Sequence, residues 1–164
     1  MPTTDPLADE RLTTLGLLVE AHAGLTRELE RRLERDCGLP VQWFEVLIRL
    51  ARTPGGQLRM TDLAAQTVLT PSGLTRVVDK LEAAGLVRRL SCPSDRRGSF
   101  ATLTTKGRRR IEAAVPVHLA HIDELVGGVL SPTDLAELAA LMRRLRDAVN
   151  PAAAEASTCP PTAS

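Results

Sequence analysis

A short amphipathic stretch that begins at Pro71 carries polar and basic side chains on one side. Its apolar residues recur at intervals of three and four, so they form one stripe of a helix: Leu74, Val77, Val78 and Leu81. The other side carries Ser72, Thr75, Arg76, Asp79 and Lys80. Hydroxyl and guanidinium groups bond to base edges and phosphates. The pattern therefore predicts a helix with one face in a protein core and the other available to nucleic acid.

Four arginines follow in a segment with the pattern of a β-hairpin. Residues 86–91 and 99–103 are β-compatible runs, and the segment between them, CPSDRRG, is rich in turn formers. The arginines lie in the first run and in the turn: Arg88, Arg89, Arg96 and Arg97. Guanidinium groups neutralise phosphates and favour a narrow minor groove, so we expect a basic loop beside the helix.

Capping residues place a second short helix directly before the first. Thr70 offers an N-cap hydroxyl ahead of a first-turn proline, and Gly85 offers the left-handed residue that ends the helix. Thr61 is the expected N-cap of the preceding helix. Two short helices joined by a tight turn and followed by a hairpin are typical of a winged helix-turn-helix. Residues 57–59 are a candidate third strand.

Longer helices flank this module. Helical patterns run from about residue 7 to 36 and from 41 to 52. Thr104 is expected to cap a helix that reaches about Val126, with Pro116 bending it or dividing it in two. A serine followed by proline at 131–132 begins a last helix that ends near residue 150.

The last helix has an apolar seam that a small winged helix cannot cover alone. The seam steps by three and four, as in a coiled coil, through Leu135, Leu138, Met142, Leu145 and Val149. We therefore predict a single mainly α-helical domain over residues 1–164, in which residues 7–36 and 112–150 are dimerisation helices. They flank a winged-helix module at 40–111 with a small β-hairpin wing, and 151–164 form a disordered tail. Packing of the seam within one chain is the alternative.

Charge is unevenly distributed along the 164 residues, although the formal net charge is only +1. Residues 70–110 contain ten Lys or Arg and three Asp or Glu, whereas the rest of the chain has 11 basic and 17 acidic residues. A basic centre with acidic ends is typical of a phosphate-binding surface, and a solvated charged face is the simpler alternative. The basic run coincides with the predicted helix-turn-helix and hairpin, which favours DNA.

These segments resemble the MarR family of bacterial regulators. The similarity lies in DLAAQTVLTPSGLTRVVDKLEAAGLVRR, in the D-x-R…L-T pattern of DRRGSFATLT, and in the T-x-x-G that begins at Thr104. It extends over roughly residues 40–150. It implies an obligate homodimer that binds a palindromic operator on double-stranded DNA, as a repressor released by a small-molecule effector. The operator, the regulated genes, the effector and the choice between repression and activation stay open.

The resemblance also assigns roles within the hairpin loop. Asp95 is expected to steady the basic side chains while Arg97 enters the minor groove, with Arg96 as the second candidate. The full set of predicted DNA contacts is Thr70, Ser72, Thr75, Arg76, Lys80, Arg88, Arg89, Asp95, Arg96 and Arg97.

The sequence also offers candidate residues for a ligand pocket, a zinc site and a reactive thiol. The side chains that could line a pocket between the first helices and the DNA module are His22, Trp43, Phe44 and His118, and ordinary core packing explains them equally well. His118 and His121 have an i, i+3 spacing that could bind zinc with Cys37, Glu45, Asp123 or Glu124, although such pairs are usually structural. Cys92 lies among arginines that could lower its pKa, but no resolving cysteine accompanies it. We predict no metal and no cofactor.

Other classes of function find little support. The sequence lacks a nucleophile-elbow motif, a glycine-rich phosphate loop and a zinc-protease motif, so we expect no enzyme and no catalytic residues. It also lacks a signal peptide and any apolar run near 18 residues, which predicts a cytoplasmic protein without a membrane partner. A winged helix that serves as a protein-interaction module is the remaining alternative from another class.

Overall fold

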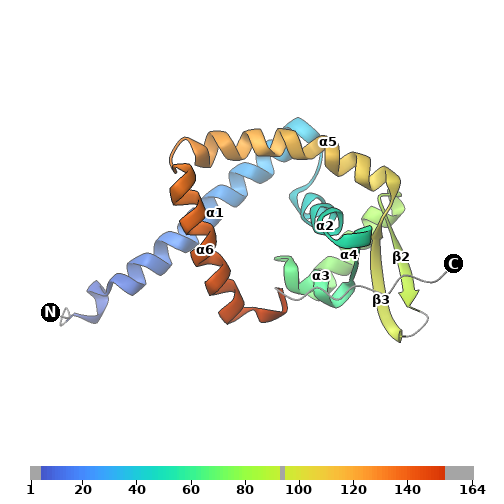
Figure 1. Ribbon diagram of the computed structural model, residues 1–164, viewed down its shortest axis with the longest axis horizontal. Helices are drawn as coiled ribbons and strands as arrows, with labels where there is room; N and C mark the ends of the chain where they lie inside the picture. The colour runs from blue at the N-terminus through green and yellow to red at the C-terminus, as the bar shows by residue number, and fades with distance from the viewer. Residues whose placement is uncertain (1–4, 93–94, 154–164) are drawn as a thin grey trace.

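The computed structural model describes residues 5–92 and 95–153, and it describes side chains at all of these except 91, 92 and 95–98. It confirms a mainly helical winged helix-turn-helix with long flanking helices (Figure 1). The elements are α1 (Glu10–Cys37), α2 (Val41–Arg52), β1 (Gln57–Arg59), α3 (Met60–Gln66), α4 (Pro71–Ala83), β2 (Val87–Cys92), β3 (Asp95–Leu103), α5 (Thr105–Ile122) and α6 (Pro132–Val149). Single helical turns lie at Pro6–Ala8, Pro54–Gly56, Asp123–Gly127 and Pro151–Ala153.

The three strands form one antiparallel sheet in the order β1-β3-β2. The predicted short strand at Gln57–Arg59 is confirmed, and its central residue Leu58 pairs with Ala101. The hairpin is longer than the sequence suggested. Strand β3 begins at Asp95, which is the register partner of Cys92 beyond an irregularity after Ser91.

Asp95, Arg96 and Arg97 therefore lie in a strand, and the prediction that placed them in the loop was wrong. Their residue types suggested a turn, but strand pairing is made by backbone groups, which must find hydrogen-bond partners whatever the side chains are. What those three side chains contact lies outside the described residues, as does the side chain of Cys92.

Capping follows the predictions in α4 and departs from them in α3. The Thr70 hydroxyl accepts a hydrogen bond from the amide of Gly73 at 3.1 Å, and Gly85 adopts φ +72°, as expected for the two ends of α4. Helix α3 instead begins at Met60, one residue before the predicted cap at Thr61. Its N-cap position is Arg59, without a side-chain cap, because the strand β1 leads directly into the helix.

The core lies where α2, α3 and α4 pack on the sheet and on the ends of α1 and α5. Its fully buried side chains include Leu33, Leu47, Leu50, Leu58, Leu63, Leu74, Val78, Leu81, Phe100 and Ile111. Burying each of these side chains stabilises the fold by about 1.5–3 kcal/mol before the entropy of ordering is subtracted. The apolar stripe predicted for α4 is buried completely, so the opposite face of α4 is directed to solvent.

A close backbone contact joins the DNA module to α5. The Thr104 hydroxyl accepts from the amide of Gly107 at 3.0 Å and donates to the carbonyl of Gly85 at 2.8 Å. A Cβ atom at position 107 would lie 2.0 Å from the carbonyl oxygen of Leu86, a distance that only glycine permits. The T-x-x-G pattern thus fixes where the long helix α5 leaves the wing.

The terminal helices leave much of their apolar surface uncovered. Pro116 lies within a continuous α5, which passes at Asp123 into a π-helical turn that ends at Gly127. Helix α6 has no buried residue, and its seam leucines remain 40–45% exposed at positions 135, 138 and 145. No single helix in residues 5–92 and 95–153 is long and apolar enough to cross a membrane; only the bent pair formed by 105–127 and 132–149 reaches that length and composition.

The chain after α6 returns to the helix-turn-helix. The side-chain amide of Asn150 donates to the carbonyl of Ala65 at 3.0 Å, near the end of α3. A 3-10 turn follows at Pro151–Ala153 and lies against α3 (Figure 1). The prediction of disorder was therefore wrong for residues 151–153, because they find a docking site on α3, and for residues 154–164 it falls outside the described residues.

We expect Gly107→Ala to destabilise the protein by about 2 kcal/mol or more, because the added methyl group forces the backbone of Leu86 away from α5. Gly24→Ala is the matched control, since nothing lies within 4 Å of the added atom in α1 and alanine favours a helix. Urea unfolding of both variants measures the difference. Equal stability of the two variants would contradict the role given to this contact.

Candidate DNA-binding surface and ligand pocket

The exposed face of α4 carries the side chains that the sequence assigned to base edges. Ser72, Thr75, Arg76 and Lys80 are all exposed, while the opposite stripe is in the core. The Thr75 hydroxyl donates to the carbonyl of Pro71 at 3.0 Å, and the hydroxyls of Thr70 and Ser72 lie 3.3 Å apart. The first turn of α4 therefore presents a cluster of hydroxyl groups, followed by two cations further along the helix.

Arg89, predicted as a DNA contact, makes its contacts within the protein. Its guanidinium forms an ion pair with Asp79 at 2.5 Å and donates to the carbonyl of Thr75 at 3.2 Å. Its backbone amide donates to Glu82 at 2.9 Å. Strand β2 is thus bonded to the adjoining face of α4, and the guanidinium of Arg89 is paired within the protein. Arg89 was predicted to contact a phosphate because the sequence does not reveal that Asp79 and Glu82 of α4 face strand β2.

Arg88, the neighbouring residue in β2, is exposed. Successive residues of a strand point to opposite faces, so Arg88 and Arg89 cannot share a role. In the part of the chain that the structure describes, no ion pair of Arg76, Lys80 or Arg88 is found. Of the cations that α4 and β2 carry, these three therefore have no ion-pair partner among the described residues.

A lysine that the sequence analysis missed closes the other end of α4. The ammonium group of Lys106 donates to the carbonyl of Ala84 at 2.8 Å, one of the groups that the end of a helix leaves without an intrahelical partner. A cation also interacts favourably with the partial negative charge at a helix C-terminus. The sequence shows that Lys106 belongs to the basic run. It does not show that Lys106 meets Ala84, because the two residues are 22 positions apart.

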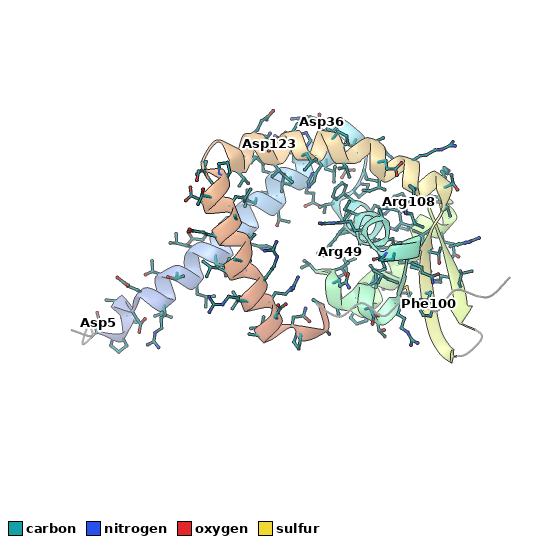
Figure 2. The ribbon with its side chains drawn as sticks, viewed as in Figure 1. Asp5, Asp36, Arg49, Phe100, Arg108 and Asp123 are labelled. Atoms are coloured by element: carbon teal, nitrogen blue, oxygen red, sulfur yellow. The ribbon has the colours of Figure 1, made fainter. Side chains whose placement is uncertain are left out.

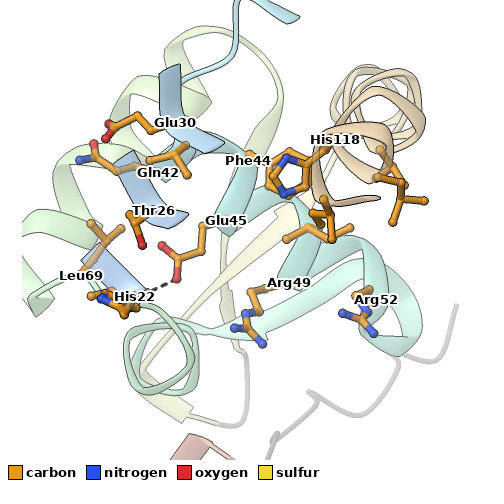
Figure 3. Close-up of a pocket in the computed structure, with 16 residues that line it drawn as sticks. His22, Thr26, Glu30, Gln42, Phe44, Glu45, Arg49, Arg52, Leu69 and His118 are labelled. Carbon is orange, nitrogen blue, oxygen red and sulfur yellow. Dashed lines mark hydrogen bonds between the residues drawn. The ribbon is translucent and has the colours of Figure 1, made fainter. Parts of the chain in front are cut away.

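A cavity of about 790 Å³ lies between α1, α2, α5 and the turn that joins α3 to α4 (Figure 3). It brings together three of the four residues predicted to line a pocket: His22, Phe44 and His118. Trp43 does not line it, and that part of the prediction was wrong. Adjacent residues of a helix point about 100° apart, so Trp43 packs against the core on another side of α2 than Phe44.

Several polar side chains line this cavity that were not predicted to do so. Glu45, Arg49 and Arg52 follow one another along α2 at intervals of four and three, and Thr26 and Glu30 come from α1. The helical spacing in α2 was a usable signal, whereas the approach of α1 was not predictable. A cavity of this volume with apolar walls and a few polar groups has the character of a small-molecule site.

His118 lies in this cavity as a neutral base. Burial, with a smaller contribution from His121, lowers its pKa below the usual range, so the ring is uncharged at pH 7. Its ring centroid lies 4.4 Å from that of Phe44 (Figure 3). Its Nδ1 atom is buried and has no hydrogen-bond partner among the described residues. A neutral imidazole next to an aromatic ring can bond to a polar group of a mainly apolar ligand.

His121 is committed to a structural contact. Its Nε2 lies 2.8 Å from the carboxylate of Asp36, at the end of α1. The pKa of Asp36 is lowered to about 2, chiefly by the hydrogen bond from Arg35 and then by that from His121. Among the described residues, no three His, Cys, Asp or Glu side chains are grouped so as to hold a metal ion. The zinc-responsive alternative therefore gains no support from this pair of histidines.

The arrangement defines a winged helix-turn-helix: one face of α4 is exposed, the β2–β3 wing lies beside α4, and long helices flank the module (Figures 1 and 2). The MarR family profile matches residues 38–98. The repressor Rv2887 of Mycobacterium tuberculosis is 37% identical over 102 residues, 60% of this chain and 71% of the relative.

Two solved structures extend the likeness to nearly the whole chain. Sco3205, a MarR family transcriptional regulator from Streptomyces coelicolor in complex with DNA, is 34% identical with a TM-score of 0.79, covering 92% of this chain and 94% of Sco3205. NadR in complex with 4-hydroxyphenylacetate is 28% identical with a TM-score of 0.69, covering 88% and 97%. The chain belongs to the MarR family.

Proposed function

We propose that the protein is a sequence-specific transcriptional regulator of double-stranded DNA, a homodimeric repressor that a small molecule releases from a palindromic operator. The observation that carries this proposal is the exposed polar and basic face of α4, held beside the wing by the Arg89–Asp79 ion pair. The Sco3205 complex with DNA and the repressor Rv2887 support it by family membership. The protein acts in the cytoplasm, where its targets are, and binding rather than catalysis is its activity.

Each exposed side chain has a proposed role. Ser72, Thr75 and Arg76, on the first turns of α4, contact base edges in the major groove, and Thr70 contacts the adjoining phosphate. Lys80 and Arg88 neutralise phosphates. Asp95, Arg96 and Arg97 belong to the wing, which reaches the neighbouring minor groove. Arg89 positions the wing on α4 instead of contacting DNA.

Operator binding should weaken steeply as salt is added, because the cations of both protomers displace counterions from phosphates. With roughly six to ten phosphate contacts per dimer, raising salt from about 50 to about 200 mM should cost on the order of 1,000-fold in affinity. Titration of a fluorescent fragment from the upstream region of its own gene measures this slope. A slope near zero would contradict the proposed function.

Arg76→Ala should relax the sequence preference, with a loss of about 1–3 kcal/mol confined to one base pair in each half-site. Lys80→Ala is the control, since a phosphate contact carries no sequence information and its loss should weaken all sequences alike. Binding to a panel of single-base operator variants separates the two. If both substitutions weaken every sequence equally, Arg76 does not read a base.

The dimer is proposed to form through α1 and α6. Apolar side chains on both helices are exposed in the single chain, among them Leu12, Leu15, Leu25, Leu135, Leu138 and Leu145. Exposed apolar residues that repeat at coiled-coil spacing along α6 indicate that a second helix packs against them. Two protomers would then place two copies of α4 on successive turns of DNA.

Replacing both Leu138 and Leu145 with aspartate should dissociate the dimer, because each unpaired carboxylate placed in an apolar seam costs several kcal/mol. The matched control replaces Ala136 and Ala140 with aspartate, since these exposed residues lie on the opposite side of α6. Sedimentation velocity reports the oligomeric state. An intact dimer in the leucine variant would place the interface elsewhere.

The cavity is proposed as the effector site. NadR supports this by family membership, since it was solved with 4-hydroxyphenylacetate bound. The apolar walls of the cavity bury a small ligand, and the neutral ring of His118 lines it beside Phe44.

A further inference from the structure

One wall of the cavity is directly bonded to the helix-turn-helix. The carboxylate of Glu45, in α2, accepts a hydrogen bond from the backbone amide of Val68 at 3.1 Å (Figure 3). Val68 lies in the turn between α3 and α4, and both residues line the cavity together with Leu69. A single side chain therefore belongs to the cavity and also supports the turn that leads into α4.

Few other contacts hold this turn. Helix α3 ends at Gln66, where the hydroxyl of Thr67 turns back to the carbonyl of Leu63 at 2.9 Å. The side chain of Val68 is 82% exposed, so its burial contributes little to the position of the turn. Leu69 packs against the core on one side only. The hydrogen bond to Glu45 is thus a substantial part of what orients the backbone at Val68.

The position of the turn matters because α4 begins three residues after Val68. Thr70, the N-cap of α4, lies beside Ser72, and these hydroxyls form the end of α4 proposed to enter the major groove. The buried stripe of α4 begins only at Leu74, so the first turn of α4 depends on the segment before it.

We propose that Glu45 is a positioning residue for operator recognition, which holds the turn at Val68 so that the first turn of α4 is preorganised for DNA. This rests on the proposed function. A protein whose DNA-contacting helix is already ordered loses less conformational freedom when it binds DNA. A molecule in the cavity that displaced the Val68 amide from the Glu45 carboxylate would loosen this turn and so weaken DNA binding.

The test compares three variants on the same operator fragment. Glu45→Ala removes the acceptor and the charge. Glu45→Gln removes the same charge but keeps an oxygen that can accept from Val68. Glu30→Ala removes a different carboxylate of the cavity, one on α1. Each is measured by operator affinity, by the salt dependence of that affinity, and by hydrogen exchange of the Val68 amide in NMR spectra of the full chain.

We expect Glu45→Ala to weaken operator binding by about three- to tenfold, the size expected for one exposed hydrogen bond. The salt dependence should stay unchanged, because no phosphate contact is lost. Exchange should become faster at Val68 and its neighbours in the turn and not in the core. Glu45→Gln and Glu30→Ala should match the parent protein in all three measurements.

Several results would overturn the proposal: parental affinity of Glu45→Ala, an equal loss in Glu45→Gln, or faster exchange throughout the molecule, which would indicate general destabilisation. Failure of the proposed function looks different. The parent protein would then bind no fragment of its upstream region, while exchange at Val68 would still report whether Glu45 holds the turn.

Discussion

The contact between the Leu86 carbonyl and Gly107 is the constraint on which the arrangement of this protein depends. At this point the end of α4, the start of the wing and the start of α5 meet within one hydrogen-bonded junction. The DNA-binding module and the long helix α5 are therefore joined by one closely packed junction. A side chain at position 107 would separate them, and the spacing between two copies of α4 in a dimer would change with it.

The basic residues fall into two groups: some are paired inside the protein, and others are exposed to solvent. Arg89 is neutralised by Asp79 and Glu82 and joins the wing to α4. Arg110 is likewise internal, since its guanidinium donates to the backbone carbonyls of Cys37 and Gly38 and closes the end of α1. The surface charge available to DNA is therefore smaller than the local count of arginines suggests. In the proposed function, specificity therefore rests on a few groups of α4, and the other exposed cations supply attraction that depends on salt.

The cavity is lined by the turn that precedes α4, so a ligand bound there would lie next to the start of this helix. Its lining includes the helix α1, which has an uncovered apolar face, and the turn before α4. Asn150, after α6, holds the end of α3 from the other side. Besides its packing in the core, the segment from α3 to α4 is thus joined to α2 and to the residue after α6 by one exposed hydrogen bond each. Bonds of this kind are weak enough to be exchanged for contacts with a ligand or a second protomer.

The sequence by itself determined most of the helices and strands and the buried face of α4. The caps at Thr70 and Gly85, the apolar stripe of α4 and the helical runs are local features, because capping and amphipathic spacing act within a few residues. Only the tertiary structure decided which polar groups meet. Arg89 and Asp79, Glu45 and Val68, and Asn150 and Ala65 are 10, 23 and 85 residues apart. Long-range pairing depends on how whole elements pack, and no spacing along one helix or one turn contains that information.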